Sequence, residues 1–114
     1  MRLIACAAIA VVFLLSGCGP SRQELMNEGL TQFQSGNEVE SDATFHRLLD
    51  HYPSDPAALY YLGRLNHSQG NYAQAMYYYQ AAIDADPSNQ SAREYLKKAQ
   101  LDSGLKAGTP RYAP

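Results

Sequence analysis

The sequence of 114 residues has no tryptophan, only two cysteines, no excess of basic residues and no long apolar run. Its longest apolar segment, residues 3–15, would form a helix of about 20 Å, whereas the hydrocarbon core of a bilayer is about 30 Å thick. Nine Lys and Arg side chains stand against eleven Asp and Glu, a net charge of −2. These absences argue against a comfortable membrane span and against nucleic acid, which requires a basic surface to neutralise its phosphates.

Both cysteines lie at the N-terminal end: Cys6 is within that apolar segment, and Cys18 follows it. Arg2 precedes the segment, and small residues follow it, which is the pattern of a secretory signal peptide. The four residues Leu15-Ser16-Gly17-Cys18 resemble the lipobox of bacterial lipoproteins, in which cleavage precedes an acylated cysteine. The resemblance implies a signal peptide over residues 1–17, lipidation of Cys18 and a short linker over residues 18–21. The alternatives are cleavage that leaves a free cysteine and an uncleaved anchor.

Acylation of Cys18 would leave the exported chain without a thiol, because Cys6 departs with the signal peptide. No disulfide, cysteine nucleophile or cysteine metal site is then expected. A single acyl chain binds membranes only marginally, and the lipoprotein resemblance implies three. It also implies an address: Gly19 follows the cysteine, in place of the aspartate that tends to retain such proteins in the inner membrane. We therefore expect a lipid anchor in the cell membrane, in the outer membrane and facing the periplasm where the source has two membranes.

An internal repeat organises the rest of the chain. A shift of 34 positions aligns eight pairs of identical or similar residues, namely Leu25 with Leu59, Gly29 with Gly63, Gly36 with Gly70, Asn37 with Asn71, Phe45 with Tyr79, Leu49 with Ile83, Asp50 with Asp84 and Pro53 with Pro87. The second unit closely resembles the tetratricopeptide repeat at its signature positions Leu59, Leu62, Gly63, Tyr72, Ala75, Tyr79, Ala82 and Pro87. The first unit departs from that pattern at Glu28 and Ser41, where leucine and alanine are usual. The resemblance implies an all-α solenoid of two α-hairpin repeats, residues 22–55 and 56–89.

Capping residues predict the same helices independently. Asp55 before Pro56 is a cap followed by proline at the first helical position, and Gly36 is suited to end a helix. Capping boxes are predicted for Ser21 with Glu24, Asn37 with Glu40, and Asn71 with Gln74. Gly63 lowers helix propensity by about 1 kcal/mol relative to alanine, so we expect a neighbouring side chain to occupy its space.

A further helix is predicted over residues 90–102, capped by Asn89. It carries Ala92, Tyr95, Leu96 and Ala99 on one face and polar residues on the other. An array of stacked repeats needs such a terminal helix with a water-compatible outer face. Residues 103–114 are rich in glycine and proline and lack periodicity, which predicts a disordered tail. The alternative for the tail is a short docking segment.

Catalytic and metal-binding patterns are not found in the sequence. The zinc signature His-Glu-x-x-His does not occur, and His46 and His51 are five residues apart, so they would point to different sides of a helix. His67 has no histidine or cysteine nearby in the sequence. Glu38, Glu40 and Asp42 suit the start of a helix electrostatically and lack an apolar pocket that would separate their pKa values. We therefore predict no enzymatic activity, no metal and no cofactor.

The resemblance implies that the first helix of each repeat lines an inner groove that receives a protein or peptide. Residues carried onto that groove are Gln23, Met26, Asn27, Tyr60, Tyr61, Arg64, His67, Glu94 and Lys98, with Ser91 at its end. Leu30 and Phe33 belong either to the groove or to the core between the helices. The basic and amide clamp of chaperone-binding members is missing, because its positions are held by Met26, Leu30, Tyr61, Ser91 and Tyr95.

The triplet Tyr77-Tyr78-Tyr79 predicts a second surface. Tyr79 has a core position in the repeat, so at least one of the other two tyrosines should be exposed on the convex side, as tyrosines of interfaces are. A lipobox followed by such repeats resembles lipoproteins that assist secretin, type IV pilus or outer-membrane protein assembly. The functional prediction is a membrane-anchored adaptor that binds a protein of the cell envelope. The alternative is a structural lipoprotein that weakly associates with itself.

Overall fold

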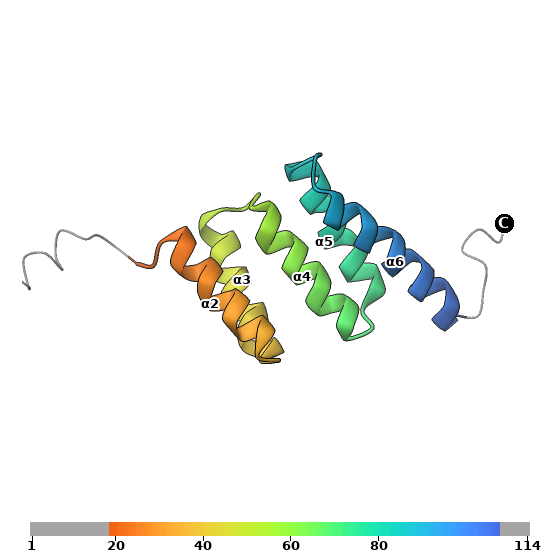
Figure 1. The fold of residues 1–114 in the computed structure, drawn as a ribbon, viewed down its shortest axis with the longest axis horizontal. Coiled ribbons are helices and arrows are strands. Elements are labelled where there is room, and N and C mark those ends of the chain that lie inside the picture. Colours follow the sequence, from red (N-terminus) through yellow and green to blue (C-terminus); the bar gives the residue numbers. More distant parts are fainter. Residues whose placement is uncertain (1–18, 108–114) are drawn as a thin grey trace, which may run out of the picture.

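The computed structural model describes residues 19–107, and all five helices in this range run antiparallel to their neighbours (Figure 1). They are α2 (Arg22–Gln34), α3 (Glu38–His51), α4 (Pro56–Ser68), α5 (Tyr72–Ala85) and α6 (Gln90–Ala107). Helices α2 and α3 form one hairpin, α4 and α5 form the next, and α6 packs against α5 at the end of the row. The all-α prediction is confirmed over this range. The predicted signal peptide, Cys18 and residues 108–114 lie outside it.

The helix starts confirm three of the five predicted caps. The Ser21 hydroxyl accepts from the Glu24 amide at 3.2 Å, and the Glu24 carboxylate accepts from the Ser21 amide at 2.7 Å. That amide, followed by the Ser21 hydroxyl, lowers the pKa of Glu24. The Asp55 carboxylate accepts from the Ala58 amide at 3.0 Å, and the Asn89 side chain accepts from the Ala92 amide at 3.1 Å.

The predicted caps at Asn37 and Asn71 are wrong, since neither side chain makes a capping hydrogen bond. Each asparagine instead closes the preceding helix through its backbone: the Asn37 amide donates to the Gln32 carbonyl at 2.9 Å, and the Asn71 amide donates to the Asn66 carbonyl at 2.8 Å. The glycine before each asparagine has φ of +78°, the left-handed conformation of a Schellman turn. In a turn this tight the asparagine backbone does not reach the extended conformation that side-chain capping requires.

Each hairpin is closed by a glycine that faces an aromatic ring. A Cβ atom placed on Gly29 would lie 2.8 Å from the Phe45 ring, and one placed on Gly63 would lie 2.5 Å from the Tyr79 ring. Both glycines therefore allow a helix approach that any other residue would prevent without a shift of the ring. This confirms that a neighbouring side chain fills the space at Gly63.

The two departures from the repeat pattern are accommodated in different ways. Ser41 is fully buried, and its hydroxyl donates to the Gly29 carbonyl across the first hairpin at 3.0 Å. Glu28 lies on the surface, where its carboxylate is 4.0 Å from Arg47. A small buried side chain and an exposed charged one both leave the helix packing intact.

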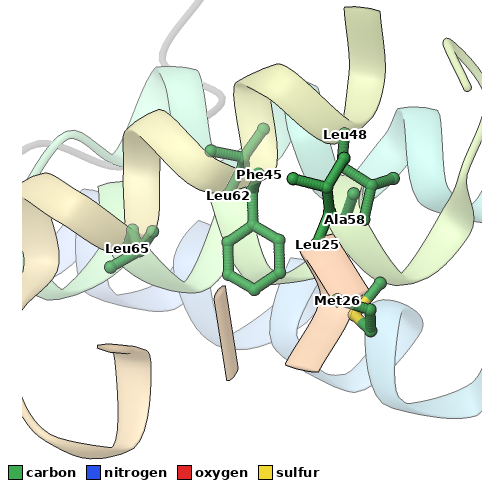
Figure 2. Close-up of a cluster of buried hydrophobic side chains, with 7 residues drawn as sticks. All are labelled: Leu25, Met26, Phe45, Leu48, Ala58, Leu62 and Leu65. Carbon is green, nitrogen blue, oxygen red and sulfur yellow. The ribbon is translucent and has the colours of Figure 1, made fainter. Parts of the chain in front are cut away.

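The core runs continuously from the first hairpin to α6. Figure 2 shows the side chains of α2, α3 and α4 gathered in one cluster, which consists of Leu25, Met26, Phe45, Leu48, Ala58, Leu62 and Leu65. Two smaller clusters join the second hairpin to α6 through its buried Ala92 and Ala99, with Tyr95 and Leu96 packed at the edge. The predicted inner face of this helix is therefore confirmed. Burial of apolar surface between successive helices is what stabilises such a stack.

The last helix is longer than predicted. Helix α6 continues to Ala107, so residues 103–107 are helical rather than part of a disordered tail. Asp102, the last residue of the predicted helix, contacts His67 of α4. No helix in the described range is both long enough and apolar enough to span a bilayer.

The tyrosine triplet of α5 divides as predicted. Tyr79 is fully buried, Tyr78 is half-buried beside His46, and 65% of Tyr77 is exposed.

An ion pair also links the two hairpins: Arg22 at the start of α2 contacts the buried carboxylate of Asp55, which also caps α4.

Candidate protein-binding groove

A shallow pocket of about 240 Å³ lies where α2, α4 and α6 come together with the first turn of α3. Its lining consists of Phe33, Glu38, Arg64, His67, Ser68, Tyr95 and Lys98, and we call it the Arg64 pocket. All but Glu38 come from the first helices of the repeats and from α6, the helices expected to line the inner groove. The pocket therefore lies on the predicted binding face.

Arg64 is held among aromatic rings. Its guanidinium carbon lies 4.3 Å from the centre of the Tyr95 ring, 5.4 Å from that of Phe33 and 5.7 Å from that of Tyr60. Within the described residues its hydrogen bond goes to the Tyr60 hydroxyl, at 3.0 Å. Burial by itself lowers the pKa of Arg64, but this hydrogen bond and the neighbouring tyrosines raise it overall. The guanidinium is thus a fixed positive charge on an aromatic platform.

Lys98 adds a second positive charge on α6. Its ammonium lies 5.7 Å from the centre of the Tyr95 ring, and the side chain is exposed. Among residues 19–104 neither Lys98 nor Arg64 has a carboxylate within ion-pair distance. Two cations on one face of the pocket are therefore not neutralised by the described part of the chain.

Glu38, the acidic residue of the pocket lining, is hydrogen-bonded to residues at the end of α4. The Glu38 carboxylate accepts hydrogen bonds from the Ser68 hydroxyl at 3.0 Å and from the Gln69 amide at 3.2 Å. These bonds tie the start of α3 to the end of α4. Glu38 therefore closes one side of the pocket and does not approach the two cations closely enough to pair with them.

His67 has a structural role that the sequence did not predict. Its Nε2 atom lies 2.6 Å from the Asp102 carboxylate and its Nδ1 atom lies 3.2 Å from the Tyr79 hydroxyl, so both ring nitrogens are engaged. Only 12% of the His67 side chain is exposed. His67 lies on the predicted groove face, but most of its side chain is buried. It joins α4 to α5 and α6, and it contributes part of the pocket wall.

The remaining predicted groove residues are dispersed. Gln23 and Asn27 are exposed on α2 and bond to each other at 2.9 Å, while Glu94 is exposed on α6 and accepts from Gln90 at 3.1 Å. Ser91 is also exposed on α6. The structure thus brings together Arg64, His67 and Lys98 of the predicted set and leaves these four at the surface outside the pocket lining.

Met26 is a correction to the predicted groove. Only 6% of its surface is exposed, and it belongs to the core cluster between the hairpins. It lies between α2 and the neighbouring α3 and α4, whose apolar side chains complete the same cluster. It is not among the residues that line the pocket.

Tyr60 and Tyr61 lie beneath the pocket. Both are half-buried and their rings meet edge-to-face, with centres 5.1 Å apart. Tyr61 also stacks on Phe45, with centres 5.4 Å apart, and contacts Phe33. Burial raises the pKa of the Tyr60 hydroxyl, which therefore stays neutral beside Arg64. These tyrosines support the platform that holds Arg64.

Sequence reasoning missed Tyr95, Ser68 and Glu38 as pocket residues and left Phe33 undecided. The sequence placed Tyr95 on the core-facing side of its helix and at a position of the missing clamp, but not among the binding residues, although it lies 34 positions after Tyr61 and three before Lys98. That spacing on one helix face is a signal that could have placed it in the groove. Phe33 belongs to the core between the helices and also to the groove, since its ring contacts Tyr61 and lines the pocket.

The chemistry available at this site is binding. The chain of Asp102, His67 and Tyr79 resembles a proton relay in outline, but Tyr79 is fully buried and burial raises its pKa, so it offers no accessible nucleophile. In the described part of the chain no three His, Cys, Asp or Glu residues are grouped so that they could hold a metal ion. His46 and His51 are exposed on α3.

The comparisons with known proteins agree with this geometry. The search of curated proteins gave no match. The family described as tetratricopeptide repeat matches residues 26–90, which is more than half of the chain and includes most of both hairpins. Proteins with this repeat generally mediate protein–protein interactions and are typically non-enzymatic scaffolds. The repeated sequence, the two α-hairpins and this match together place the chain in the tetratricopeptide repeat family.

Proposed function

We propose that this protein is a lipid-anchored adaptor that faces the periplasm and holds a partner of an envelope assembly at the membrane. The observation that carries the proposal is the Arg64 pocket, where two cations without carboxylate partners lie beside aromatic rings on the inner face of the repeats. Aromatic residues and arginine are enriched where proteins bind one another. Secretin, pilus and outer-membrane protein assembly are the kinds of machinery that the sequence layout suggests.

The membrane part of the proposal is supported by the sequence alone. Residues 15–18 have the lipobox pattern, and Gly19 follows the cysteine. An anchored protein encounters its partner in two dimensions, so a groove of modest, micromolar affinity is sufficient. A small repeat protein can then act as an adaptor without a large interface.

The anchor is tested by Cys18→Ser, with Cys6→Ser as the matched control. We expect Cys18→Ser to abolish acylation and to release the protein from membranes, whereas Cys6→Ser should remain anchored. Membrane fractionation and mass spectrometry of the N-terminal peptide measure both effects. Tight membrane association of Cys18→Ser would refute the anchor.

The groove is tested by crosslinking in the native envelope, followed by mass spectrometry. Arg64→Glu combined with Lys98→Glu should lose the crosslinked partner, because the pocket changes sign. Lys97→Glu is the matched control, since Lys97 lies next to Lys98 on the same helix but not in the pocket. Circular dichroism verifies that the variants are folded. Undiminished capture by the double variant would move the binding site elsewhere.

Self-association is the second candidate, and the exposure of Tyr77 favours it. Concentration-dependent sedimentation of the wild-type protein, reduced in Tyr77→Ala, would support it. A monomer at all concentrations would remove it.

A further inference from the structure

We infer that the Arg64 pocket binds the side-chain carboxylate of an acidic residue that lies next to an apolar residue in the partner. The inference rests on the proposed function of the groove and names the chemistry that the groove selects. Such binding differs from recognition of a chain terminus.

Arg64 and Lys98 both have hydrogen-bond donors that the described residues do not use. A guanidinium has five N–H donors, and within the described residues Arg64 gives one hydrogen bond, to the Tyr60 hydroxyl. Lys98 has three N–H donors and no ion pair in the same range. Because a carboxylate accepts from both kinds of cation and such charge-assisted bonds are the stronger ones, it is the ligand group that these donors fit.

Two carboxylates near the pocket could compete for these cations. Glu38 is occupied by Ser68 and Gln69, and Asp102 is occupied by His67. Both carboxylates therefore bond to other helices, and neither forms an ion pair with Arg64 or Lys98. Glu38 keeps its charge, because its two donors are neutral, but the N–H donors of the two cations remain available to a carboxylate from outside the described chain.

The pocket also has an apolar wall. The rings of Phe33 and Tyr95 both line the pocket, and both contact the guanidinium. An inorganic anion would leave these rings in water, whereas a peptide with an apolar side chain beside its carboxylate would cover them. The lining therefore favours an acidic and apolar peptide segment.

The lining also distinguishes a side-chain carboxylate from a terminal one. Chain termini are captured by clusters of backbone N–H groups or by clamps of basic and amide side chains. The described lining contains no amide side chain, and the clamp positions are held by other residues. The helix N-terminus at the pocket, that of α3, begins with Glu38, which is itself negative. We therefore assign the pocket to an internal Asp or Glu of the partner.

The experiment uses the full chain in detergent and three probe peptides of five residues, each labelled with a fluorophore on its N-terminal amine. The first has the sequence Gly-Phe-Glu-Phe-Gly with an amidated C-terminus, and the second has glutamine in place of glutamate. The third has the glutamine sequence with a free C-terminal carboxylate. Anisotropy titrations at low and at physiological salt measure the affinity of each peptide.

We expect the glutamate peptide to bind the wild-type protein about tenfold or more tightly than either glutamine peptide, as a charge-assisted bond predicts. The preference should fall to about one in Lys98→Gln and in Arg64→Gln, and it should persist in Lys97→Gln. Lys98 is exposed, so its substitution leaves the core intact even if the Arg64 variant folds poorly.

Equal affinity for the glutamate and amidated glutamine peptides would overturn the inference. So would a preference that survives in Lys98→Gln, binding of the free-acid peptide as tight as that of the glutamate peptide, or no saturable binding at about 1 mM. These failures are distinct from failure of the adaptor proposal. A partner captured equally by wild type and Lys98→Gln would retain the adaptor and reject the carboxylate, while a glutamate preference without any envelope partner would do the reverse.

Discussion

At the scale of single residues, two glycines fix how closely the helices of each hairpin approach. Gly29 faces Phe45 and Gly63 faces Tyr79, in equivalent positions of the two repeats. The 34-residue repeat identified these glycines because both the small residue and the aromatic one recur. Their pairing across the hairpin is the physical content of the repeat signature.

Gly63→Ala should therefore destabilise the protein. The added Cβ would lie 2.5 Å from the buried Tyr79 ring, and overpacking typically costs about 1–3 kcal/mol. Because a contact of 2.5 Å forces the ring to shift, we expect a cost in the upper part of that range, about 2–3 kcal/mol. Higher helix propensity returns about 1 kcal/mol, so the net loss in the free energy of unfolding should be about 1–2 kcal/mol. Urea denaturation measures it.

A double variant controls for the cause. In Gly63→Ala with Tyr79→Leu the ring is gone, so the combined loss should be smaller than the sum of the two single losses. Simple additivity, or a Gly63→Ala variant as stable as wild type, would contradict the close packing as the reason for glycine.

At the scale of elements, α6 differs most from its prediction. The sequence predicts the helix end at residue 102, because the residues that follow are rich in glycine and proline and lack periodicity. In the structure the helix reaches Ala107, and Asp102, which lies within the predicted span, contacts His67 on α4. A contact between residues 35 positions apart has no local sequence signal, which is why the role of His67 could not be predicted.

Asp102→Asn should loosen α6 locally. The amide replaces a charge-assisted hydrogen bond to His67 with a weaker one, so we expect a loss of about 1 kcal/mol or less for this partly exposed pair. Amide hydrogen exchange should accelerate in the second half of α6 and remain unchanged in α2.

Asp84→Asn is the matched control, since Asp84 is exposed on α5 and accepts only from Gln80 of the same helix among the described residues. It should leave exchange in α6 at the wild-type rate. If both variants accelerated exchange equally, the His67 contact would not be what holds α6.

At the scale of the whole molecule, stability depends on each helix covering the next. Tyr79 and Ala82 of α5 are fully buried only because α6 also covers them. Ala99 completes the cluster around Tyr79, and Ala92 completes the cluster around Ala82. The Arg22–Asp55 ion pair and the first core cluster link the two hairpins in the same way. The array therefore behaves as a chain of nearest-neighbour interfaces.

Truncation after Asn89 tests that view. Loss of α6 uncovers Tyr79, Ala82 and Leu59, and fully buried apolar side chains contribute about 1.5–3 kcal/mol each, so we expect a loss of about 3 kcal/mol or more. The midpoint of urea denaturation measures it. Truncation after Ala107 retains every described helix and is the control. An unchanged midpoint after the shorter truncation would show that α6 is not part of the cooperative unit.

The sequence by itself determined the local structure of this protein. Hydrophobic periodicity, glycine at the turns and the caps at Ser21, Asp55 and Asn89 depend on neighbours within a few residues, so the helices and their repeat could be predicted from the order of residues. The burial of Tyr79, and the exposure of at least one of its two preceding tyrosines, followed from its position in the repeat.

Only the tertiary structure decided which side chains meet. Met26 is buried by contact with two other helices, His67 is taken up by Asp102 and Tyr79, and Arg64 is surrounded by rings from α2, α4 and α6. The repeat places each of these residues on an inner face but does not specify its partners, because the spacing between helices depends on the side chains of all of them. The pocket and its unpaired charge arise from that packing.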